Sequence, residues 1–261
     1  MSCITLLTDF GLQDATVASA KGILMQHTPH LPIVDISHQV TPHQVMQAAY
    51  LLLSAYKNFP PGTCHVVLVN VFYDKAPRMV LCEKDRHYFL APDNGLLSLA
   101  FNETDGYSCY QWHPESTFKD WLNETGKAIE HIQVATQKEA YTSCTLQKAT
   151  DRYAPKINAD SAECRVIHID HYENIIVNIT REQFETAARG RNFRIEYMRG
   201  EAITTLNNSY AEVKKSERLC RFNSAGYLEI AIKDGNAAGL FGLRVYQEQH
   251  VIYNSIKIFF E

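Results

Sequence analysis

Near the amino terminus the chain reads Ile4-Thr5-Leu6-Leu7-Thr8-Asp9-Phe10-Gly11-Leu12-Gln13-Asp14. The apolar run at 4–7 is typical of a buried parallel strand, and a helical pattern of apolar residues follows at 17–25. Ligands of open α/β sheets bind at the carboxyl ends of strands, which is where Asp9 lies. A carboxylate beside a glycine suits a polar small molecule such as a ribose diol. The simpler interpretation is that Asp9 and Asp14 cap the following helix.

The composition limits the class of protein. A chain of 261 residues, 46% of them hydrophobic, can form one large or two modest domains with a real core. A net charge of -4 argues against nucleic-acid and membrane-surface partners. No apolar run approaches the roughly 20 residues of a membrane span, and no signal-peptide pattern is present, so we expect a cytoplasmic protein. Seven scattered cysteines without a Cys-x-x-Cys pair predict reduced, mostly buried thiols and no zinc site.

Strands alternate with helices through the first part of the chain. Further strands are expected at 31–38 and 64–69, and a hairpin at 79–91. A helix is expected to begin at Thr41-Pro42, since threonine is a good N-cap and proline suits the first helical position. This alternation predicts a layered α/β domain over 1–150.

The pattern changes after residue 150. The polar, proline-containing segment 151–163 is interpreted as a linker. Short alternating runs then follow, which are expected as strands at 164–170, 175–179, 193–197, 227–232, 243–246 and 251–260. Many short strands predict a smaller antiparallel β-barrel-like carboxy-terminal domain over 164–261, which completes an α/β fold class.

Several motifs occur together in a recognisable order. They are Thr8-Asp9-Phe10-Gly11, Val34-Asp35-Ile36-Ser37-His38, Phe59-Pro60-Pro61-Gly62-Thr63, Ala91-Pro92-Asp93-Asn94-Gly95-Leu96-Leu97 and Asn223-Ser224-Ala225-Gly226-Tyr227-Leu228-Glu229-Ile230-Ala231. In order and spacing the chain resembles the S-adenosylmethionine (SAM) hydroxide adenosyltransferases, relatives of the SAM-dependent fluorinase and chlorinase. The resemblance covers about four-fifths of the chain and omits the linker region and the loop after the third strand.

The resemblance implies a specific chemistry. Enzymes of this family displace methionine from ribose C5′ by in-line attack of water, hydroxide or a halide. The hydroxide-using members release adenosine and methionine. The sulfonium is already a good leaving group, so no metal or redox cofactor is expected. The site must instead hold C5′ and the nucleophile in line and remove water from the nucleophile. The resemblance also implies a homotrimer, with the ligand between the amino-terminal domain of one subunit and the carboxy-terminal domain of the next.

The family's ligand-binding positions are present in this chain. They correspond to Asp9, Asp14, Asp93, Asn94, Asp170, Tyr172, Asn174, Asn223 and Ser224. By this resemblance Asp9 binds the ribose hydroxyls, Asp170 the methionine ammonium and Ser224 the methionine carboxylate. Tyr172 and Asn174 bind adenine. These residue types suit their ligands, because a carboxylate accepts from a diol or a cation and an aromatic face stacks on a purine.

This chain has a different residue type at each position of the family's water-activating set. The Asp, Arg and His of that set fall on Asn70, Pro77 and Lys119. One hypothesis is that other charged residues rebuild the cluster from shifted positions. The candidates are Asp74, Arg78, Lys119 and Asp120. The alternative is that attack on C5′ is lost and the protein only binds SAM or adenosine.

Two simpler or rival interpretations remain open. Asp74 and Arg78 are also typical of ordinary surface charge. The third functional hypothesis is a metal-dependent hydrolase whose metal would be held by Asp9, Asp35, His38 and Asp93 at the strand ends.

Overall fold

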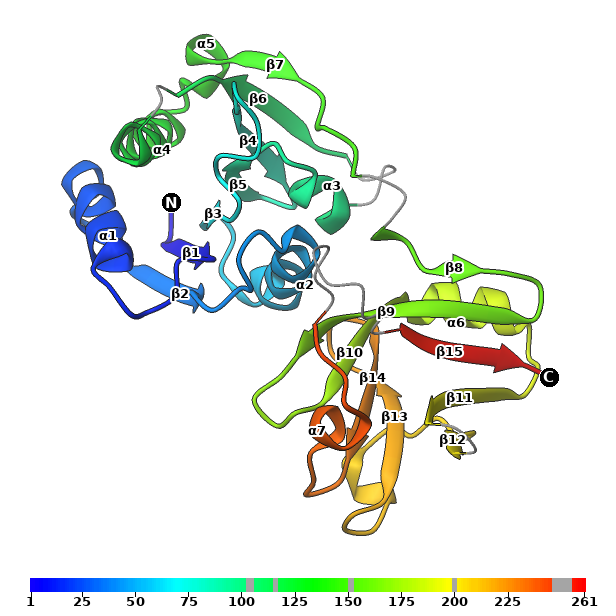
Figure 1. The fold of residues 1–261 in the computed structure, drawn as a ribbon. Helices are drawn as coiled ribbons and strands as arrows, with labels where there is room; N and C mark the ends of the chain where they lie inside the picture. The colour runs from blue at the N-terminus through cyan, green and yellow to red at the C-terminus, as the bar shows by residue number, and fades with distance from the viewer. Residues whose placement is uncertain (102–105, 115–116, 150–152, 199–200, 246–254) are drawn as a thin grey trace. The chain divides into compact units, whose positions relative to one another are not determined.

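The computed structural model describes residues 1–101, 106–114, 117–149, 153–198, 201–245 and 255–261. These residues form two compact units, Met1–Thr150 and Asp151–Glu261, each with its own sheet (Figure 1). Within the described residues, no helix is both long and apolar enough to cross a bilayer.

A seven-stranded mixed sheet forms the middle of the amino-terminal unit. Its strand order is β2-β1-β3-β5-β4-β6-β7. The bounds are β1 Ile4–Thr8, β2 Ile33–Ser37, β3 Cys64–Leu68, β4 Met79–Lys84, β5 His87–Pro92, β6 Ser108–Trp112 and β7 Thr142–Cys144. The first four strands in this order are parallel neighbours, and the others pair antiparallel. The carboxyl ends of β1, β2 and β3 therefore meet at one edge.

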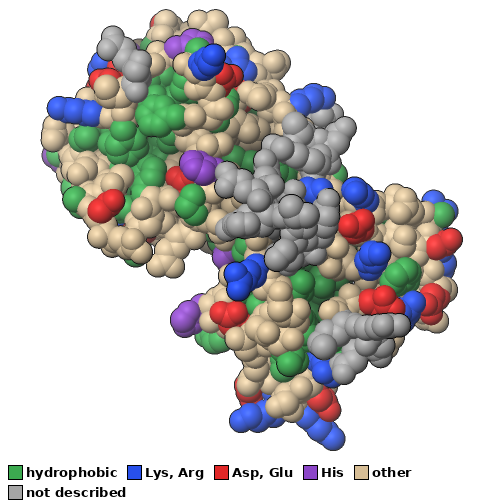
Figure 2. Space-filling view, in the orientation of Figure 1, with side chains coloured by type: hydrophobic (Ala, Val, Ile, Leu, Met, Phe, Trp, Pro, Cys, Tyr) green, Lys and Arg blue, Asp and Glu red, His purple; other side chains and the backbone are tan. Residues whose placement is uncertain are grey.

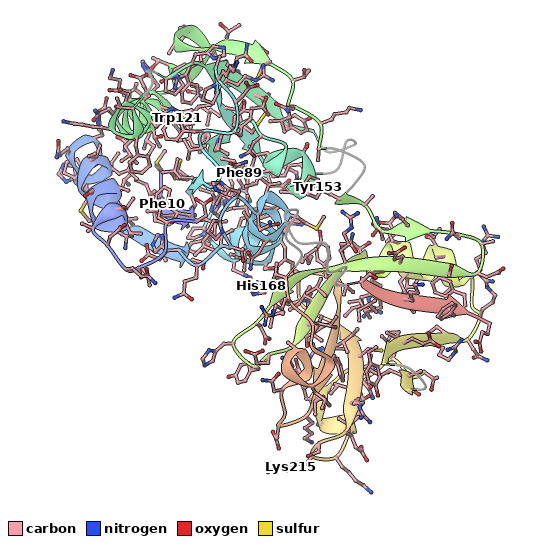
Figure 3. The ribbon with its side chains drawn as sticks, in the orientation of Figure 1. Phe10, Phe89, Trp121, Tyr153, His168 and Lys215 are labelled. Carbon is pink, nitrogen blue, oxygen red and sulfur yellow. A yellow bond between two sulfur atoms is a disulfide. The ribbon has the colours of Figure 1, made fainter. Side chains whose placement is uncertain are left out.

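Helices cover both faces of this sheet. They are α1 Thr16–His27, α2 Val45–Ala55, η1 Tyr56–Asn58, α3 Leu96–Ala100, α4 Phe118–Gln133 and α5 Gln137–Ala140. The buried side chains of α1 and α4 share one apolar cluster with the strands, and Trp121 of α4 is fully buried in it (Figure 3). On the opposite face, Tyr56 and Phe89 pack edge-on beside α2. The layered α/β prediction is confirmed.

The predicted start of α2 is wrong. The helix begins at Val45, not at Thr41-Pro42, because His43 adopts a left-handed backbone with φ of 66°. A helix cannot continue through that conformation. Residues 41–44 instead form a turn closed by the Gln44 N–H, which donates to the Thr41 carbonyl at 3.0 Å.

The carboxy-terminal unit is an eight-stranded antiparallel sheet. Its path runs β12-β11-β15-β9-β10-β14-β13, with β8 paired to β9. The bounds are β8 Lys156–Ile157, β9 Ser161–Ile169, β10 Ile175–Thr180, β11 Phe193–Met198, β12 Glu201–Ile203, β13 Arg218–Phe222, β14 Tyr227–Ile232 and β15 Ser255–Phe260. The helices are α6 Arg181–Ala188, η3 Tyr210–Glu212 and α7 Ala237–Phe241. Leu206, just after β12, pairs with Cys220 of β13, so the two ends of the sheet approach one another. The barrel-like prediction is confirmed.

Some local predictions differ from the structure. The segment 151–163 contains β8 and the start of β9, since pairing across β8, β9 and β15 extends the sheet beyond the alternating pattern. Residues 243–245 are not a strand, and 246 and 251–254 lie outside the described residues. The strands β6, β7, β8, β12 and β13 were not predicted, because none of them has the apolar run that identified β1 or β3.

The prediction of reduced cysteines is wrong for one pair. Cys82 of β4 and Cys109 of β6 face each other directly in the antiparallel ladder and form a disulfide. Directly opposed residues of such a pair have close Cβ atoms, so a register that the sequence does not reveal brings the sulfurs together. The other five cysteines are free, and all except the half-buried Cys144 are buried, as predicted.

Candidate functional site

Asp9 follows β1 and connects two other loops. Its Oδ2 accepts hydrogen bonds from the backbone N–H groups of His43, at 3.0 Å, and Asn70, at 3.1 Å. These residues lie in the loops after β2 and β3. The carboxylate therefore does not cap α1. Its Oδ1 has no donor among the described residues, which leaves that oxygen for a ligand hydroxyl.

The side chains of these loops are also joined. His43 Nδ1 lies 3.0 Å from Asn70 Oδ1. From the loop after β5, Asn94 Nδ2 donates to the Val69 carbonyl at 2.9 Å and to the Asn70 carbonyl at 3.3 Å. Asn94 thus holds the backbone of the Asn70 loop through these two carbonyls. Three strand ends converge on Asp9 through these bonds.

A second chain of polar contacts fixes the base of the Asp9 turn. Buried Thr8 and His38 are joined by a 2.9 Å bond between Oγ1 and Nδ1. His38 Nε2 lies 3.1 Å from Asp35 Oδ1, and Lys21 donates to Asp35 Oδ2 at 2.6 Å. Against the effect of its partial burial, Lys21 and His38 hold the pKa of Asp35 below its usual value. Asp35 and His38 therefore have protein partners.

Asp93 is a buried carboxylate paired with Arg78. The Asp93 side chain is 1% exposed, and Arg78 Nε donates to its Oδ2 at 2.7 Å. The Gln147 N–H also donates to Asp93 Oδ1, at 2.9 Å. The other Arg78 nitrogens bond to Gln111 Oε1 and, at 3.3 Å, to the Thr145 carbonyl. The pair holds the Asp93-Asn94-Gly95 turn against β6 and the segment after β7.

The four predicted catalytic residues are not brought together. No hydrogen bond or ion pair joins any two of Asp74, Arg78, Lys119 and Asp120 in the described structure. Asp74 and Lys119 are exposed. Asp120 forms a capping box with Thr117 at the start of α4, a reciprocal pair of side-chain bonds to backbone N–H groups. Their catalytic roles stay predictions, and the observed contacts of Arg78 and Asp120 are structural.

Asp14 also has a local partner. Its exposed carboxylate accepts from the Thr16 N–H at 2.8 Å, and the bonds to Thr16 lower the pKa of Asp14. This is the arrangement expected of a residue that stabilises the first turn of α1. A ligand role for Asp14 stays a prediction.

In the carboxy-terminal unit, Asp170 organises the loop between β9 and β10. Its Oδ1 accepts from the backbone N–H groups of Tyr172 and Asn174, both at 2.9 Å, and its Oδ2 accepts from Asn174 Nδ2 at 2.9 Å. Glu173 sits at φ 62° inside this tight loop. Tyr172 is 76% exposed, so its aromatic face is open for stacking.

The same loop lines a cavity of about 490 Å³. Its lining residues are Asp170, Tyr172, Asn174, Tyr210, Ile232, Lys233, Asp234 and Gly235. A cavity with an apolar wall and a few convergent polar groups is the usual form of a small-molecule site. Three of the predicted binding residues therefore meet at one cavity.

Sequence reasoning missed two residues beside this cavity, Tyr210 and Glu229. The Tyr210 hydroxyl donates to Glu229 Oε1 and accepts from Asn174 Nδ2 at 3.1 Å. Burial raises the pKa of Glu229, and burial together with that carboxylate raises the pKa of Tyr210. Glu229 could have been found as an acid inside the alternating strand pattern of 227–232. No local sequence feature identified Tyr210.

Asn223 and Ser224 lie in the turn between β13 and β14. Asn223 Oδ1 accepts from the N–H groups of Ala225, at 3.0 Å, and Tyr227, at 3.1 Å. Gly226 completes the turn with φ of 79°, which glycine adopts without strain. Ser224 is exposed at the tip, where its hydroxyl is available to an anion.

The residues of the metal-site hypothesis have other contacts. The described part of the chain contains no group of three or more His, Cys, Asp or Glu side chains arranged to hold a metal ion. Asp93 is paired with Arg78, and Asp35 with Lys21 and His38.

The sequence comparisons with known proteins agree on one group of enzymes, and a solved structure shares the fold. Residues 4–136 match the SAM hydroxide adenosyltransferase N-terminal domain, and residues 164–249 match the corresponding C-terminal domain. An (R)-S-adenosyl-L-methionine hydrolase of Methanocaldococcus jannaschii is 29% identical over 97% of each chain. A fluorinase of Actinoplanes sp. is 23% identical over 87% of this chain and 90% of the relative. The structure of an uncharacterized conserved protein from Thermotoga maritima aligns with a TM-score of 0.79 at 24% identity, over 98% of this chain and 99% of the other.

Proposed function

The chain belongs to the SAM hydroxide adenosyltransferase family, and we propose on that basis that it hydrolyses SAM at ribose C5′ to adenosine and methionine. The relative from M. jannaschii carries a name that specifies the R form of SAM, and we take that form as the substrate. The observation that carries the proposal is the pairing of the family match over both units with a small-molecule cavity at Asp170, Asn174 and Tyr210.

Each ligand group has a chemically suitable partner. The open Oδ1 of Asp9 accepts from the ribose diol, and Asp170 faces the methionine ammonium. The exposed Tyr172 ring stacks on adenine, with Asn174 at its edge. The Ser224 hydroxyl donates to the methionine carboxylate. No metal or redox cofactor is required, because sulfur leaves as a neutral thioether.

The direct test is product analysis. Purified protein is incubated with (R)-SAM in water enriched in oxygen-18, and the products are separated and weighed by mass spectrometry. We expect adenosine and methionine above the protein-free blank, with the heavy oxygen at the adenosine 5′ position. Full activity in a chelator distinguishes this chemistry from a metal-dependent hydrolase. Absence of adenosine above the blank contradicts the proposal.

A second candidate is a protein that binds SAM or adenosine without chemistry. Two observations favour it: Asn70 stands where the family has an acid, and Arg78 is engaged by buried Asp93. Calorimetry that finds tight binding of intact SAM, together with no adenosine in the product analysis, would support this candidate over hydrolysis.

We also propose a homotrimer with the ligand between units of neighbouring subunits. The support is the exposure of large apolar side chains near the candidate residues of both units. Leu12 is 63% exposed and Phe72 53% in the first unit, and Leu240 is 54% exposed in the second. Figure 2 shows hydrophobic side chains on the visible face of the amino-terminal unit. Light scattering that finds three copies per particle would support this assembly, and a monomer would contradict it.

A further inference from the structure

His43 and Asn70 form a fixed pair at the Asp9 turn. Their backbone N–H groups donate to the same oxygen, Asp9 Oδ2, at 3.0 and 3.1 Å. Their side chains meet at 3.0 Å, between His43 Nδ1 and Asn70 Oδ1. Three hydrogen bonds thus hold the imidazole, the amide and the carboxylate in one arrangement.

The backbone of this pair is unusual. His43 has φ of 66° and Asn70 has φ of 50°, both in the left-handed region. Asparagine tolerates this region, and histidine enters it more often than most residues, but each still costs about 1–2 kcal/mol. Residues held in such conformations concentrate at functional sites. Here the conformation aims both N–H groups at Asp9 and both side chains at each other.

The contact with Asn70 fixes the protonation pattern of the ring. An amide oxygen is an acceptor without a proton, so His43 Nδ1 must carry the hydrogen. In the neutral imidazole the other nitrogen, Nε2, then has a free lone pair. The His43 side chain is exposed, so water can reach it.

We infer that His43 is the general base of the hydrolysis, with Asn70 as the residue that positions it. This inference rests on the proposed function. In the step, a water oxygen attacks C5′ and forms the new C–O bond, while the C5′–S electron pair passes to sulfur. Nε2 of His43 takes the water proton, and the ring becomes an imidazolium. The products are adenosine with its 5′-hydroxyl and methionine as a neutral thioether.

The location of the pair suits this step. Asp9 binds the ribose diol through Oδ1, and C5′ is attached to C4′, the ring carbon next to C3′. The base is therefore fixed by the same carboxylate that fixes the sugar. Among the described residues, the Asp9 carboxylate is the charged group that hydrogen-bonds to both members of the pair.

The first test changes the base. His43→Asn keeps a residue that tolerates φ of 66° and keeps the N–H bond to Asp9, so the variant should fold. We expect kcat to fall about 100-fold or more, the contribution typical of a general base, with KM within a few fold. The decline of kcat at acidic pH should disappear. The matched control is His30→Asn, another exposed histidine, which should leave kcat and the pH profile unchanged.

The second test changes the positioning residue. Asn70→Gly tolerates φ of 50° but removes the acceptor for Nδ1, and we expect a fall in kcat of about tenfold. Asn70→Asp restores an acceptor with a charge. It should retain activity and move the acidic limb of the pH profile to higher pH, because a carboxylate stabilises the imidazolium. A merely structural role for Asn70 would not move this limb.

A measurement that does not depend on catalytic activity separates this inference from the proposed function. Nitrogen-15 NMR of the wild type should show neutral His43 with hydrogen on Nδ1. Hydrogen on Nε2 would overturn the inference even in an active enzyme. So would a His43→Asn variant with wild-type kcat and pH profile. If the wild type forms no adenosine, the proposed function and the inference both fail.

Discussion

Replacing Arg78 with methionine tests whether this arginine is structural. The change removes every partner that Arg78 gives to Asp93, whose side chain is 1% exposed. The Gln147 N–H remains, but the charge stays buried without a cation. Removing one partner of a buried pair costs about 3–5 kcal/mol, so we expect a loss of that size in the free energy of unfolding. This is a large fraction of the about 5–15 kcal/mol that stabilises a typical domain.

Urea unfolding followed by circular dichroism measures this loss, with hydrolysis of SAM assayed in parallel. The control is Arg181→Met, which breaks the ion pair with Glu185. Those side chains are 52% and 61% exposed, so the cost should stay below about 1 kcal/mol. A double variant, Arg78→Met with Asp93→Asn, should lose less than the sum of the single variants, since no charge is left buried.

One result would refute this reasoning. If Arg78→Met unfolds within about 1 kcal/mol of the wild type but no longer hydrolyses SAM, the arginine acts on the reaction and not on the fold. The prediction of a rebuilt water-activating cluster would then gain support over the His43 pair.

Three further perturbations address other parts of the molecule. Burial, and to a smaller extent the nearby His87, lowers the pKa of His65 to about 3. As the pH falls, this imidazole is therefore protonated in the unfolded chain before it is protonated in the folded protein. Stability should therefore fall as pH drops from about 6.5 toward 3, by at most about 1.4 kcal/mol per pH unit, and His65→Gln should reduce this slope in pH-dependent unfolding. Reducing the disulfide between Cys82 and Cys109 should lower stability by about 3–4 kcal/mol, measured by thermal unfolding with and without dithiothreitol. Tyr210→Phe should weaken SAM binding about tenfold in calorimetry, because Glu229 and Asn174 lose their shared hydroxyl.

Each of these has a control. A Cys82→Ala, Cys109→Ala double variant should not respond to dithiothreitol, and a response would place the effect elsewhere. Tyr172→Phe should keep SAM affinity, since stacking needs the ring and not the hydroxyl. Equal losses in Tyr172→Phe and Tyr210→Phe would contradict the role given to the Tyr210 hydroxyl. An unchanged pH slope in His65→Gln would mean that another group carries it.

Much of the architecture was predictable from local patterns. The run at 4–7 and the apolar face at 17–25 identified β1 and α1, and the alternating segments after 164 identified the barrel-like unit. These signals are short-range, because strand and helix periods repeat over a few residues. The turn at Asp9 was found in the same way, as an acid at the end of a buried strand.

The tertiary structure decided the partners. Asp9 was expected to cap a helix or bind a ligand, and it proved to hold the loops of His43 and Asn70. The latter two lie 27 positions apart in sequence, as do Cys82 and Cys109. No local pattern records which loop ends beside which strand, since strand order and register are set by packing of the whole sheet. The sequence thus determined many of the elements and predicted which residues hold a ligand, while the sheet decided which side chains meet at the Asp9 turn.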